Sequence, residues 1–424
     1  MCRDSRVDAG TADPAGSAAP AVIVVGGKPK IVRKARALGL DVVLFQHPAA
    51  YTEQHAAHVT SAFLFDIGDV PLAVELAATV AGRRPVRHAL SLTEDGLPVA
   101  GAITDALGLP GTGAEVARLC RDKWAMRQRI ADTTCGTFPG VATELFAGEA
   151  ALLRFGAAHG WPVIVKPADH SASVGVLQVT GPDEVPFTCQ QVQAWRRSTE
   201  PPFHRVDRFV LEEFVDGPEI SVEAFSSGGR HVVLAITEKL LTETGFVEIG
   251  HALPARLQPP VAAAVRRATA GLLDAIGLRD GPSHTEFRLS GGMPRLIETH
   301  NRVGGDRIHD LVQAATGVDQ DSLWIGGPTG LLPTLQGAPA VHAAAATRFL
   351  LAEPGEVVAI EGEDEVRAHQ DVIGLDLAVG VGDWVRPLRT SWDRVGQVLV
   401  TAPTTGRAVA LADELAGRIR VVTR

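Results

Sequence analysis

The segment "LIETHNRVGGDRI", residues 296–308, starts as an apolar run and ends in side chains that can do chemistry. The polar part contains Glu298, His300, Asn301, Arg302, Gly304, Gly305 and Asp306. The run "HTEFRLS" (284–290) comes before "PRLIETH" (294–300), and only "GGM" separates the two, which is typical of a β-hairpin. The sequence therefore predicts two paired strands that end in a carboxylate, an imidazole and a guanidinium.

The expected register of this hairpin opposes acidic residues. If the turn centres on Gly292, Glu286 faces Glu298 and His284 faces His300. Residues two apart on a strand share a face, so all four side chains lie on one side. Two opposed carboxylates repel each other, and a divalent cation between them removes the conflict. Carboxylates with room for water and phosphate oxygens suit Mg²⁺.

Three other interpretations of this hairpin stay open at this point. A zinc ion fits His284, His300 and Glu286, because imidazole is a good zinc ligand. "HTE" also matches the H-x-E of zinc deaminases, although the P-C-x-x-C partner is absent. The third alternative is a charged strand face exposed to solvent.

Upstream segments have the residue types that bind nucleotides. Lys166 ends the apolar run "WPVIVKPA" (161–168), and the small-residue loop "DHSASVG" (169–175) follows it. This loop offers backbone N–H groups to phosphates, although no Walker A motif occurs. "LEEFVDGPE" (211–219) places an acidic strand end and a turn beside Glu219, which can accept hydrogen bonds from adenine and ribose. Alone, it is also ordinary turn chemistry.

Composition indicates a folded protein of two or three domains, with 424 residues, 46% hydrophobic and 21% charged. No apolar run has the roughly 18 residues of a membrane span, and a net charge of −9 disfavours nucleic acid as a partner. We expect a cytoplasmic protein. The four cysteines form no CxxC pair. Lysine is rare, with six residues: Lys28, Lys30, Lys34, Lys123, Lys166 and Lys239.

The order of elements predicts an α/β (α+β) protein. "AVIVVGG" (21–27), a helical stretch and "DVVLFQ" (41–46) form a β-α-β unit, which indicates a Rossmann-like parallel sheet. "EVARLCRDKWAMRQRIADT" predicts one helix, and "RFVLEEFV", "ISVEAFSS" and "HVVLAITEK" predict an antiparallel meander. We expect a disordered leader (1–20), an N-terminal Rossmann-like domain (21–115), a central lid (116–205), a metal-binding subdomain (206–335) and an α/β extension (336–424) that closes with a helix.

Taken in order, these segments resemble the ATP-grasp superfamily, and more closely its carboxylate–amine ligases that join amino acids into dipeptides. The resemblance covers about residues 20 to 420. It rests on "RDKWAMR", "PVIVKPADHSASVGV", "LEEFVDGPEISVE", "TEKLLTETGFVEIGHALPARL" and "TEFRL…LIETHNRVGGDRI". It implies ATP and Mg²⁺, with two metal ions expected, amino acid and amine substrates, and a homodimer.

The resemblance also implies residue roles. The ATP site would comprise Lys123 and Lys166 on the phosphates, Ser171, Ser173 and Gly175 in a lid, Glu212, Phe214 and Val215 at adenine, Glu219 at ribose, and Lys239. Glu286 and Glu298 would bind Mg²⁺, whereas His300 replaces the usual Asn of E-x-N-x-R, which leaves its role as a ligand open. Lys166 and Arg302 would act in catalysis, with Arg302 neutralising an acyl phosphate. The substrate site would comprise Glu94, His251, Arg302, Gly305 and Asp306.

Some of these roles have a plain structural alternative. Glu94 follows a strand of the N-terminal sheet, where substrates bind in such folds, but an exposed loop carboxylate is as common. Asp306 either contacts a substrate cation or caps the helix that begins near residue 307, and we favour the cap.

The expected reaction passes through an acyl phosphate, which an amine then attacks with loss of phosphate. It needs alignment and charge neutralisation, together with a closing lid. Other functions stay open: another ATP-grasp enzyme, such as a carboxylase subunit or a purine-pathway type of ligase, or a non-catalytic ATP-binding regulator.

Overall fold

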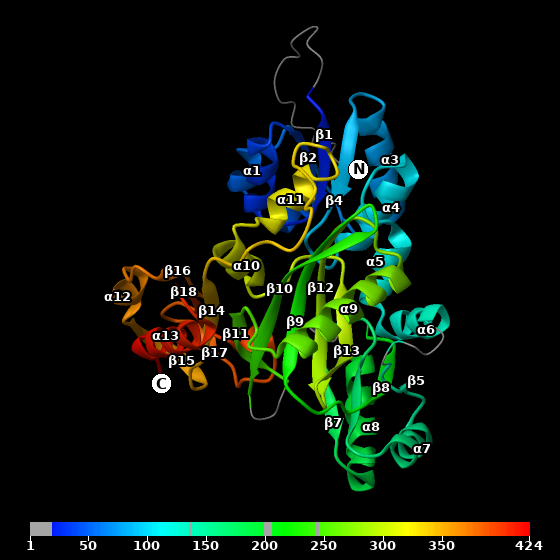
Figure 1. The fold of residues 1–424 in the computed structure, drawn as a ribbon, viewed down its shortest axis with the longest axis vertical. Helices are drawn as coiled ribbons and strands as arrows, with labels where there is room; N and C mark the ends of the chain where they lie inside the picture. Colours follow the sequence, from blue (N-terminus) through cyan, green and yellow to red (C-terminus); the bar gives the residue numbers. More distant parts are fainter. Residues whose placement is uncertain (1–18, 135–137, 139, 199–205, 243–245) are drawn as a thin grey trace, which may run out of the picture.

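The computed structural model describes residues 19–134, 138, 140–198, 206–242 and 246–424, so most of the expected leader lies outside the described residues. The strands form four sheets, of four, eight, three and four strands. Figure 1 shows the N-terminal sheet at the top, the eight-stranded sheet in the centre and the second four-stranded sheet at the bottom. Among the described residues, no helix is both long enough and apolar enough to cross a membrane.

The N-terminal sheet is parallel throughout, as predicted, with strand order β3-β2-β1-β4. The strands are β1 (Ala21–Val25), β2 (Asp41–Gln46), β3 (Ser61–Leu64) and β4 (Val86–Leu90). The helices are α1 (Pro29–Ala37), α2 (Glu53–Ala56), α3 (Val70–Ala81) and α4 (Leu97–Leu107), with a 3₁₀ turn η1 (Pro48–Ala50). β1 is fully buried because its alternate side chains pack against helices on both faces, with α1 on one side and α3 and α4 on the other.

The helix predicted around residue 120 is two helices, α5 (Ala114–Arg121) and α6 (Lys123–Thr134). The prediction of one helix was wrong because Asp122 adopts an extended backbone, with φ −102° and ψ 98°. Its side chain accepts a hydrogen bond from the backbone N–H of Ala125, which caps the first turn of α6. The break places Lys123 at the first residue of α6.

The second four-stranded sheet is antiparallel, with order β5-β8-β6-β7. Its elements are β5 (Thr143–Leu145), α7 (Glu149–His159), β6 (Val163–Pro167), β7 (Leu177–Val179), η2 (Pro182–Glu184), α8 (Val185–Arg197) and β8 (Phe209–Glu213). The predicted three-stranded meander is confirmed for its second and third strands, which pair antiparallel. It was wrong for the first strand, because β8 pairs with β5 and β6 and not with the strand that follows it. The turn at Gly217 (φ +113°) redirects the chain, and a side chain there would collide with the carbonyl oxygen of Leu289.

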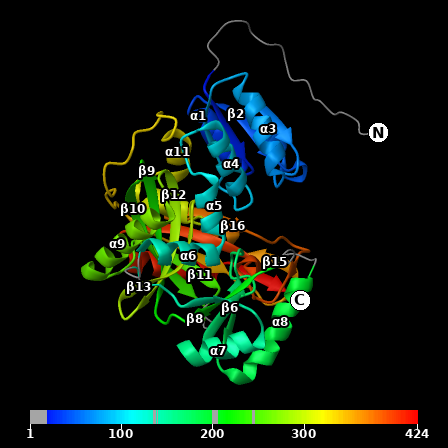
Figure 2. The same cartoon turned by 90° about the vertical axis from the view of Figure 1, so that its right-hand side faces the viewer.

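The eight-stranded sheet has the order β13-β12-β9-β10-β11-β14-β18-β16. Its strands are β9 (Glu219–Ser227), β10 (Arg230–Leu241), β11 (Glu248–Leu253), β12 (Gly281–Ser290), β13 (Met293–His300), β14 (Ala344–Leu350), β16 (Val372–Leu377) and β18 (Gly396–Ala402). One face is apolar and packs against α9 (Pro259–Ile276), α5 and α6, with Ile220, Val222 and Phe287 in its core. Figure 2 shows this sheet between the N-terminal sheet above and the β5–β8 sheet below.

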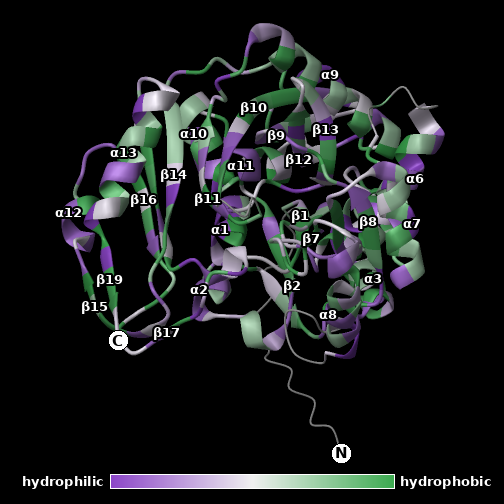
Figure 3. Cartoon of the chain, turned by 90° about the horizontal axis from the view of Figure 1, so that it is seen from below, coloured by the Kyte–Doolittle hydropathy of each residue, from purple (hydrophilic) through white to green (hydrophobic). Residues whose placement is uncertain are grey.

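The C-terminal part does not stand apart from the core, because β14, β18 and β16 extend the long sheet beyond β11. The remaining elements are α10 (Ile308–Thr316), α11 (Gln320–Gly326), β15 (Gly355–Glu361), α12 (Glu363–Arg367), β17 (Trp384–Val385), η3 (Ser391–Asp393), α13 (Thr405–Arg418) and β19 (Arg420–Thr423). The expected closing helix is α13, but β19 follows it and pairs with β15. Figure 3 shows the acidic α12 in purple at the rim of this region.

Candidate active site

Part of the second face of the long sheet is polar and largely buried. The register of five neighbouring strands places these side chains together on it. They are Glu298 and His300 on β13, His284, Glu286 and Arg288 on β12, Glu219, Ser221 and Glu223 on β9, Lys239 on β10 and His251 on β11. A buried face with this many charges requires close pairing, and the pairs define the site.

The opposed acids of the hairpin are confirmed, since Glu286 faces Glu298 and His284 faces His300. The turn, however, consists of Gly291 and Gly292, both with positive φ, and is not centred on Gly292. A register shift after Glu286 compensates for this difference and restores the predicted pairs.

Each acid is neutralised by a lysine from a different part of the fold. The Nζ atom of Lys239 lies 2.5 Å from Glu286, and that of Lys123 lies 2.9 Å from Glu298. Burial alone raises the pKa of Glu286, but the Lys239 ammonium outweighs it and lowers this pKa to about 2. Burial likewise opposes ionisation of Glu298, and Lys123 and His300 hold its pKa well below the usual range. Both carboxylates are therefore ionised at neutral pH.

The structure contradicts two of the alternative interpretations of the hairpin, the exposed charged face and the zinc site. Both acids are mostly buried, with side-chain exposures of 13% for Glu286 and 16% for Glu298. A charged strand face exposed to solvent was therefore the wrong interpretation. Within the described ranges, no three His, Cys, Asp or Glu side chains converge as a metal site, so the zinc set of His284, His300 and Glu286 is not assembled. Two opposed carboxylates do fit a hard cation that takes its other oxygen ligands from phosphate and water.

Lys166 and Glu212 form a second buried group next to this pair. Lys166 Nζ lies 2.7 Å from Glu212 Oε2, and Arg127 donates to Glu212 Oε1 at 3.1 Å. Burial lowers the pKa of Lys166, and the nearby cations Lys123 and Arg127 lower it further against the pull of Glu212. This region therefore has an excess of positive charge, which an anion would relieve. Arg127 was missed in the sequence because arginine is common on helices.

The expected adenine and ribose residues lie where the chain crosses from one sheet to the other. The carbonyl oxygen of Val215 accepts from Arg288 at 3.2 Å, and the same guanidinium lies over the ring of Phe214. Glu219 bonds Lys239 at 3.1 Å and Arg288 at 3.0 Å. Glu212 points into the lysine group with both of its oxygens engaged, so its predicted adenine contact stays a prediction.

The loop after β6 lies against the first phosphate lysine. Lys123 Nζ donates to the carbonyl oxygen of His170 at 2.6 Å, and Ser173 Oγ donates to the carbonyl of Phe246 at 2.5 Å. Ala172, Ser173 and Gly175 have positive φ angles of 58°, 59° and 70°. Two residues other than glycine in this conformation mark a strained loop, which is common at ligand sites. The roles of Ser171, Ser173 and Gly175 as lid contacts stay predictions.

Glu94 comes from the N-terminal sheet and meets the end of β13. Arg302 Nε donates to Glu94 at 2.5 Å, and His300 Nδ1 lies 3.2 Å from the same oxygen. His300 Nε2 also lies 3.1 Å from Glu298, so His300 bridges two carboxylates. Burial opposes ionisation of Glu94, but His300 and Arg302 outweigh it and hold its pKa far below the usual range. Glu94 is therefore not a plain loop residue.

Asp306 does not cap α10, so the favoured interpretation was wrong. The N-cap position is Arg307, which makes no side-chain cap bond. Asp306 instead accepts from Arg394 Nη2 at 2.7 Å and Nη1 at 2.9 Å, and it lies 3.0 Å from His251 Nε2. Burial alone raises the pKa of Asp306, but His251 and Arg394 hold it well below its usual range. Asp306 is therefore bound on both oxygens by its own chain, and its predicted contact with a substrate stays a prediction.

The two glycines before Asp306 differ. A Cβ on Gly304 would lie 3.0 Å from Glu223 Oε2 and 3.0 Å from His284 Nδ1, whereas one on Gly305 would meet nothing within 4 Å. Gly304 is therefore required by the protein's own packing. Gly305 is compatible with the predicted approach of a substrate.

Two contributors escaped the sequence prediction. Glu223 is fully buried and lies 2.8 Å from His284 Nδ1, and a carboxylate inside the apolar run "ISVEAFSS" was a signal that could have been used. Arg394 is 88 residues from Asp306, and nothing in its local sequence marks it.

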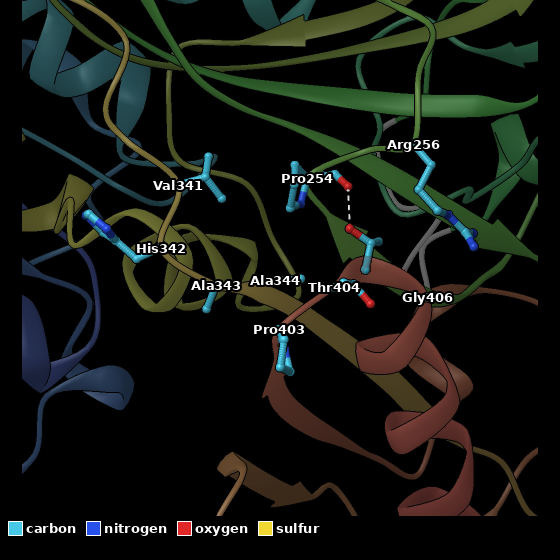
Figure 4. A pocket seen from close by; sticks show the side chains of 10 residues that line it. Pro254, Arg256, Val341, His342, Ala343, Ala344, Pro403, Thr404 and Gly406 are labelled. Carbon is cyan, nitrogen blue, oxygen red and sulfur yellow. Dashed lines mark hydrogen bonds between the residues drawn. The ribbon is translucent and has the colours of Figure 1, made fainter.

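Figure 4 shows a cavity whose lining includes none of the paired acids or lysines of the candidate site. Its volume is about 380 Å³, and it lies beside the start of α13, with Pro254, Arg256 and Thr405 in its wall. Thr405 Oγ1 donates to the carbonyl oxygen of Pro254, and Arg256 is paired with Glu238. It has no part in the acid-pair site.

Comparison with known proteins agrees with this architecture. A model of the ATP-grasp N-terminal domain matches residues 32–111, one of the ATP-grasp domain matches residues 159–310, and one of the L-amino acid ligase C-terminal domain 2 matches residues 348–424. The L-amino acid ligase of Bacillus licheniformis has a similar structure, with a TM-score of 0.81 at 23% identity, over 96% of this chain and 99% of that chain.

Two relatives are similar over shorter stretches. The alanine–anticapsin ligase of Bacillus subtilis is 27% identical over 235 residues, which are 52% of this chain and 49% of the relative. Carnosine synthase 1 of Homo sapiens is 33% identical over 131 residues, 31% of this chain and 16% of the relative. The matched region thus spans about half of the first relative and less of the second.

The matched domains, the sheet order and the paired acids define an ATP-grasp fold, as the resemblance implied. The chain belongs to the ATP-grasp superfamily and carries the C-terminal domain of the L-amino acid ligases.

Proposed function

We propose that the chain is an ATP-dependent ligase that joins the carboxylate of one amino acid to the amine of another and releases ADP and phosphate. The observation that carries this proposal is the Glu286–Glu298 pair, whose charge is balanced by lysines from β10 and α6. Lys123, Lys166 and Arg127 gather beside it with too few acids to neutralise them, which suits the phosphates of ATP.

ATP fits between the two sheets that meet at this pair. Lys123 and Lys166 bind its phosphates, and the loop at 169–175, with Ser171, Ser173 and Gly175, closes over them. Glu212 and the backbone of Phe214 and Val215 hold adenine, while Glu219 holds the ribose. Lys239, at the centre of three carboxylates, keeps the acidic face from repelling the nucleotide.

Glu286 and Glu298 are the residues that hold Mg²⁺. The ion, when bound, neutralises charge on the phosphates and aligns them. Lys123 lies against Glu298 and Lys239 against Glu286, and an ammonium group, which lacks the fixed fork of a guanidinium, can shift to phosphate when a nucleotide arrives. His300 bridges Glu94 and Glu298, which favours a role in orienting Glu298 over direct ligation.

In the first step, the carboxylate of the first amino acid attacks the γ-phosphorus of ATP and ADP leaves. Arg302 stabilises the negative charge of the resulting acyl phosphate. Glu94 holds this arginine and can also accept the ammonium group of the substrate. Gly305 leaves open space beside them for the substrate backbone. An enclosed site is needed because water would hydrolyse the acyl phosphate.

In the second step, the amine of the second substrate attacks the acyl carbon and phosphate leaves. His251 lies on the same face of the sheet, opposite Lys239 on the neighbouring strand. No nucleophilic Ser or Cys is required, because positioning and charge stabilisation carry the reaction.

A phosphate-release screen with paired amino acids and mass detection of products tests this proposal. Bicarbonate and nucleotide intermediates serve as competing substrates for the carboxylase and purine-ligase alternatives. Nucleotide binding without turnover on any substrate would instead favour a regulator. The proposal fails if no amino acid pair gives ATP-dependent product.

A further inference from the structure

The cluster of His251, Asp306 and Arg394 joins the C-terminal region to the polar face of the long sheet. His251 is on β11, Asp306 follows β13, and Arg394 follows the turn η3. Arg394 is held at four oxygens: both oxygens of Asp306, the carbonyl of Ser391 at 2.7 Å and the carbonyl of Glu248 at 3.2 Å. Its guanidinium therefore has little capacity left for a substrate, and a positioning role follows.

Aromatic contacts also hold the cluster in place. The Arg394 guanidinium lies 3.6 Å above the ring centroid of Phe349, and the His251 ring meets the edge of the same ring at 5.6 Å. Ser391, in the same turn, donates to Glu248 at 2.6 Å. A planar, stacked, bidentate arginine fixes the Asp306 carboxylate in one orientation.

This arrangement determines which nitrogen of His251 carries its proton. Asp306 is ionised and can only accept, so His251 Nε2 must be the donor of the 3.0 Å bond. The opposite nitrogen, Nδ1, is then a bare acceptor in the neutral ring. It is buried, and it has no hydrogen-bond partner among the described side chains and backbone.

We infer that Arg394 and Asp306 are positioning residues that hold His251 Nδ1 ready to receive a proton from the amine substrate. This inference rests on the proposed function and deepens its second step. The ammonium group of the second amino acid gives one proton to Nδ1, and its nitrogen then attacks the acyl carbon. The C–N bond forms, the C–O bond to phosphate breaks, and the second proton leaves with phosphate.

Hydroxylamine separates this step from the first one. It is unprotonated at neutral pH, so it attacks an acyl phosphate and gives a hydroxamate without needing a base. Each variant is therefore assayed twice with the same first amino acid and ATP, once with hydroxylamine and once with an amino acid as the amine.

The variants are Asp306→Asn, which keeps the shape but loses the charge, Arg394→Lys and Arg394→Ala. The expected result is a loss of dipeptide formation of about 100-fold in kcat for Asp306→Asn and Arg394→Ala, with hydroxamate formation within about twofold of wild type. Arg394→Lys keeps the charge and is expected to restore part of the loss. Arg418→Ala removes two exposed ion pairs in the same C-terminal region and serves as the control.

Equal losses of both products, or unchanged dipeptide formation, would overturn the positioning role. If Asp306→Asn does not fold, the ratio of the two products in Arg394→Lys gives the same decision. A wild-type protein that forms neither product overturns the proposed function itself, so the two failures are distinguishable.

Discussion

Two charged groups on the polar face of the long sheet balance their charges in different ways. One is the acid-pair centre, formed by Glu286 and Glu298, and the other is the His251 cluster, formed with Asp306 and Arg394. In the acid-pair centre, Glu286 and Glu298 are each held by a lysine through a single contact. In the cluster, Asp306 is held by both ends of an arginine that is stacked on Phe349. The first arrangement can exchange partners when ligands arrive, whereas the second is fixed before they arrive.

The largest effect is expected when one carboxylate of the Glu286–Glu298 pair is removed. Glu298→Gln keeps the shape of the side chain but removes a proposed metal ligand and the charged partner of Lys123. Ligation is expected to fall by roughly 100- to 1,000-fold, because charge on the transferring phosphate loses its stabilisation. Calorimetric Mg²⁺ titration with an ATP analogue should show weaker binding. Glu414→Gln, on the exposed surface of α13, is the control, and equal activity in the two variants would refute the metal assignment.

A second test concerns the buried contact between Glu223 and His284, next to the Glu286–Glu298 pair. Glu223→Gln removes one of the two carboxylates that pair with the buried His284 and leaves Glu286, and breaking such a buried pair costs about 3 kcal/mol of unfolding free energy. Urea denaturation measures the change. A loss below about 1 kcal/mol would mean that His284 is neutral in the folded protein.

Gly304 and Gly305 give a matched pair of smaller changes. Gly304→Ala is expected to lower the unfolding free energy by about 1 to 2 kcal/mol, because its Cβ lies 3.0 Å from Glu223 and His284. Gly305→Ala meets open space and should leave stability unchanged, while raising KM for the amino acid substrate. The same thermal melting curve for both variants would contradict the packing of Gly304.

The smallest expected effect is a shift in acid stability. The pKa of Glu286 is lowered from 4.5 to about 2 in the folded state. Its ionised form therefore contributes fully to the unfolding free energy above pH 4.5, and this contribution is lost as the pH falls toward 2. Lys239→Met removes the main cause of this lowering, so acid unfolding should begin at a higher pH. Lys28→Met, at an exposed position, is the control. Fluorescence-monitored acid titrations that coincide for the two variants would contradict the ion pair.

The two regions also differ in how far the sequence predicts them. The acid pair follows from strand alternation and a short turn, so local spacing was enough to oppose Glu286 and Glu298. The parallel N-terminal sheet was predictable from the local order of an apolar strand, a helix and a second strand. Asp306 was misassigned because the local signal for a helix cap was plain, while its real partner, Arg394, is distant in the sequence and unmarked.

Long-range connections explain the other failures. The β8 strand was predicted to join the following strands, because a sequence does not reveal that the turn at Gly217 sends the chain to another sheet. The α/β extension (336–424) was expected from its strand and turn signals, but local sequence does not reveal that three of its strands complete the long sheet. The resemblance to a family pointed to Lys123 and Lys166, but their neighbour Arg127 was hidden among many arginines.

The most direct test of the proposed reaction follows the oxygen of the substrate carboxylate. A first amino acid labelled with ¹⁸O in its carboxylate is incubated with ATP, Mg²⁺ and a second amino acid. The acyl-phosphate route predicts that the released inorganic phosphate carries ¹⁸O and that the nucleotide product is ADP. Unlabelled phosphate, or release of AMP and pyrophosphate, would contradict the account.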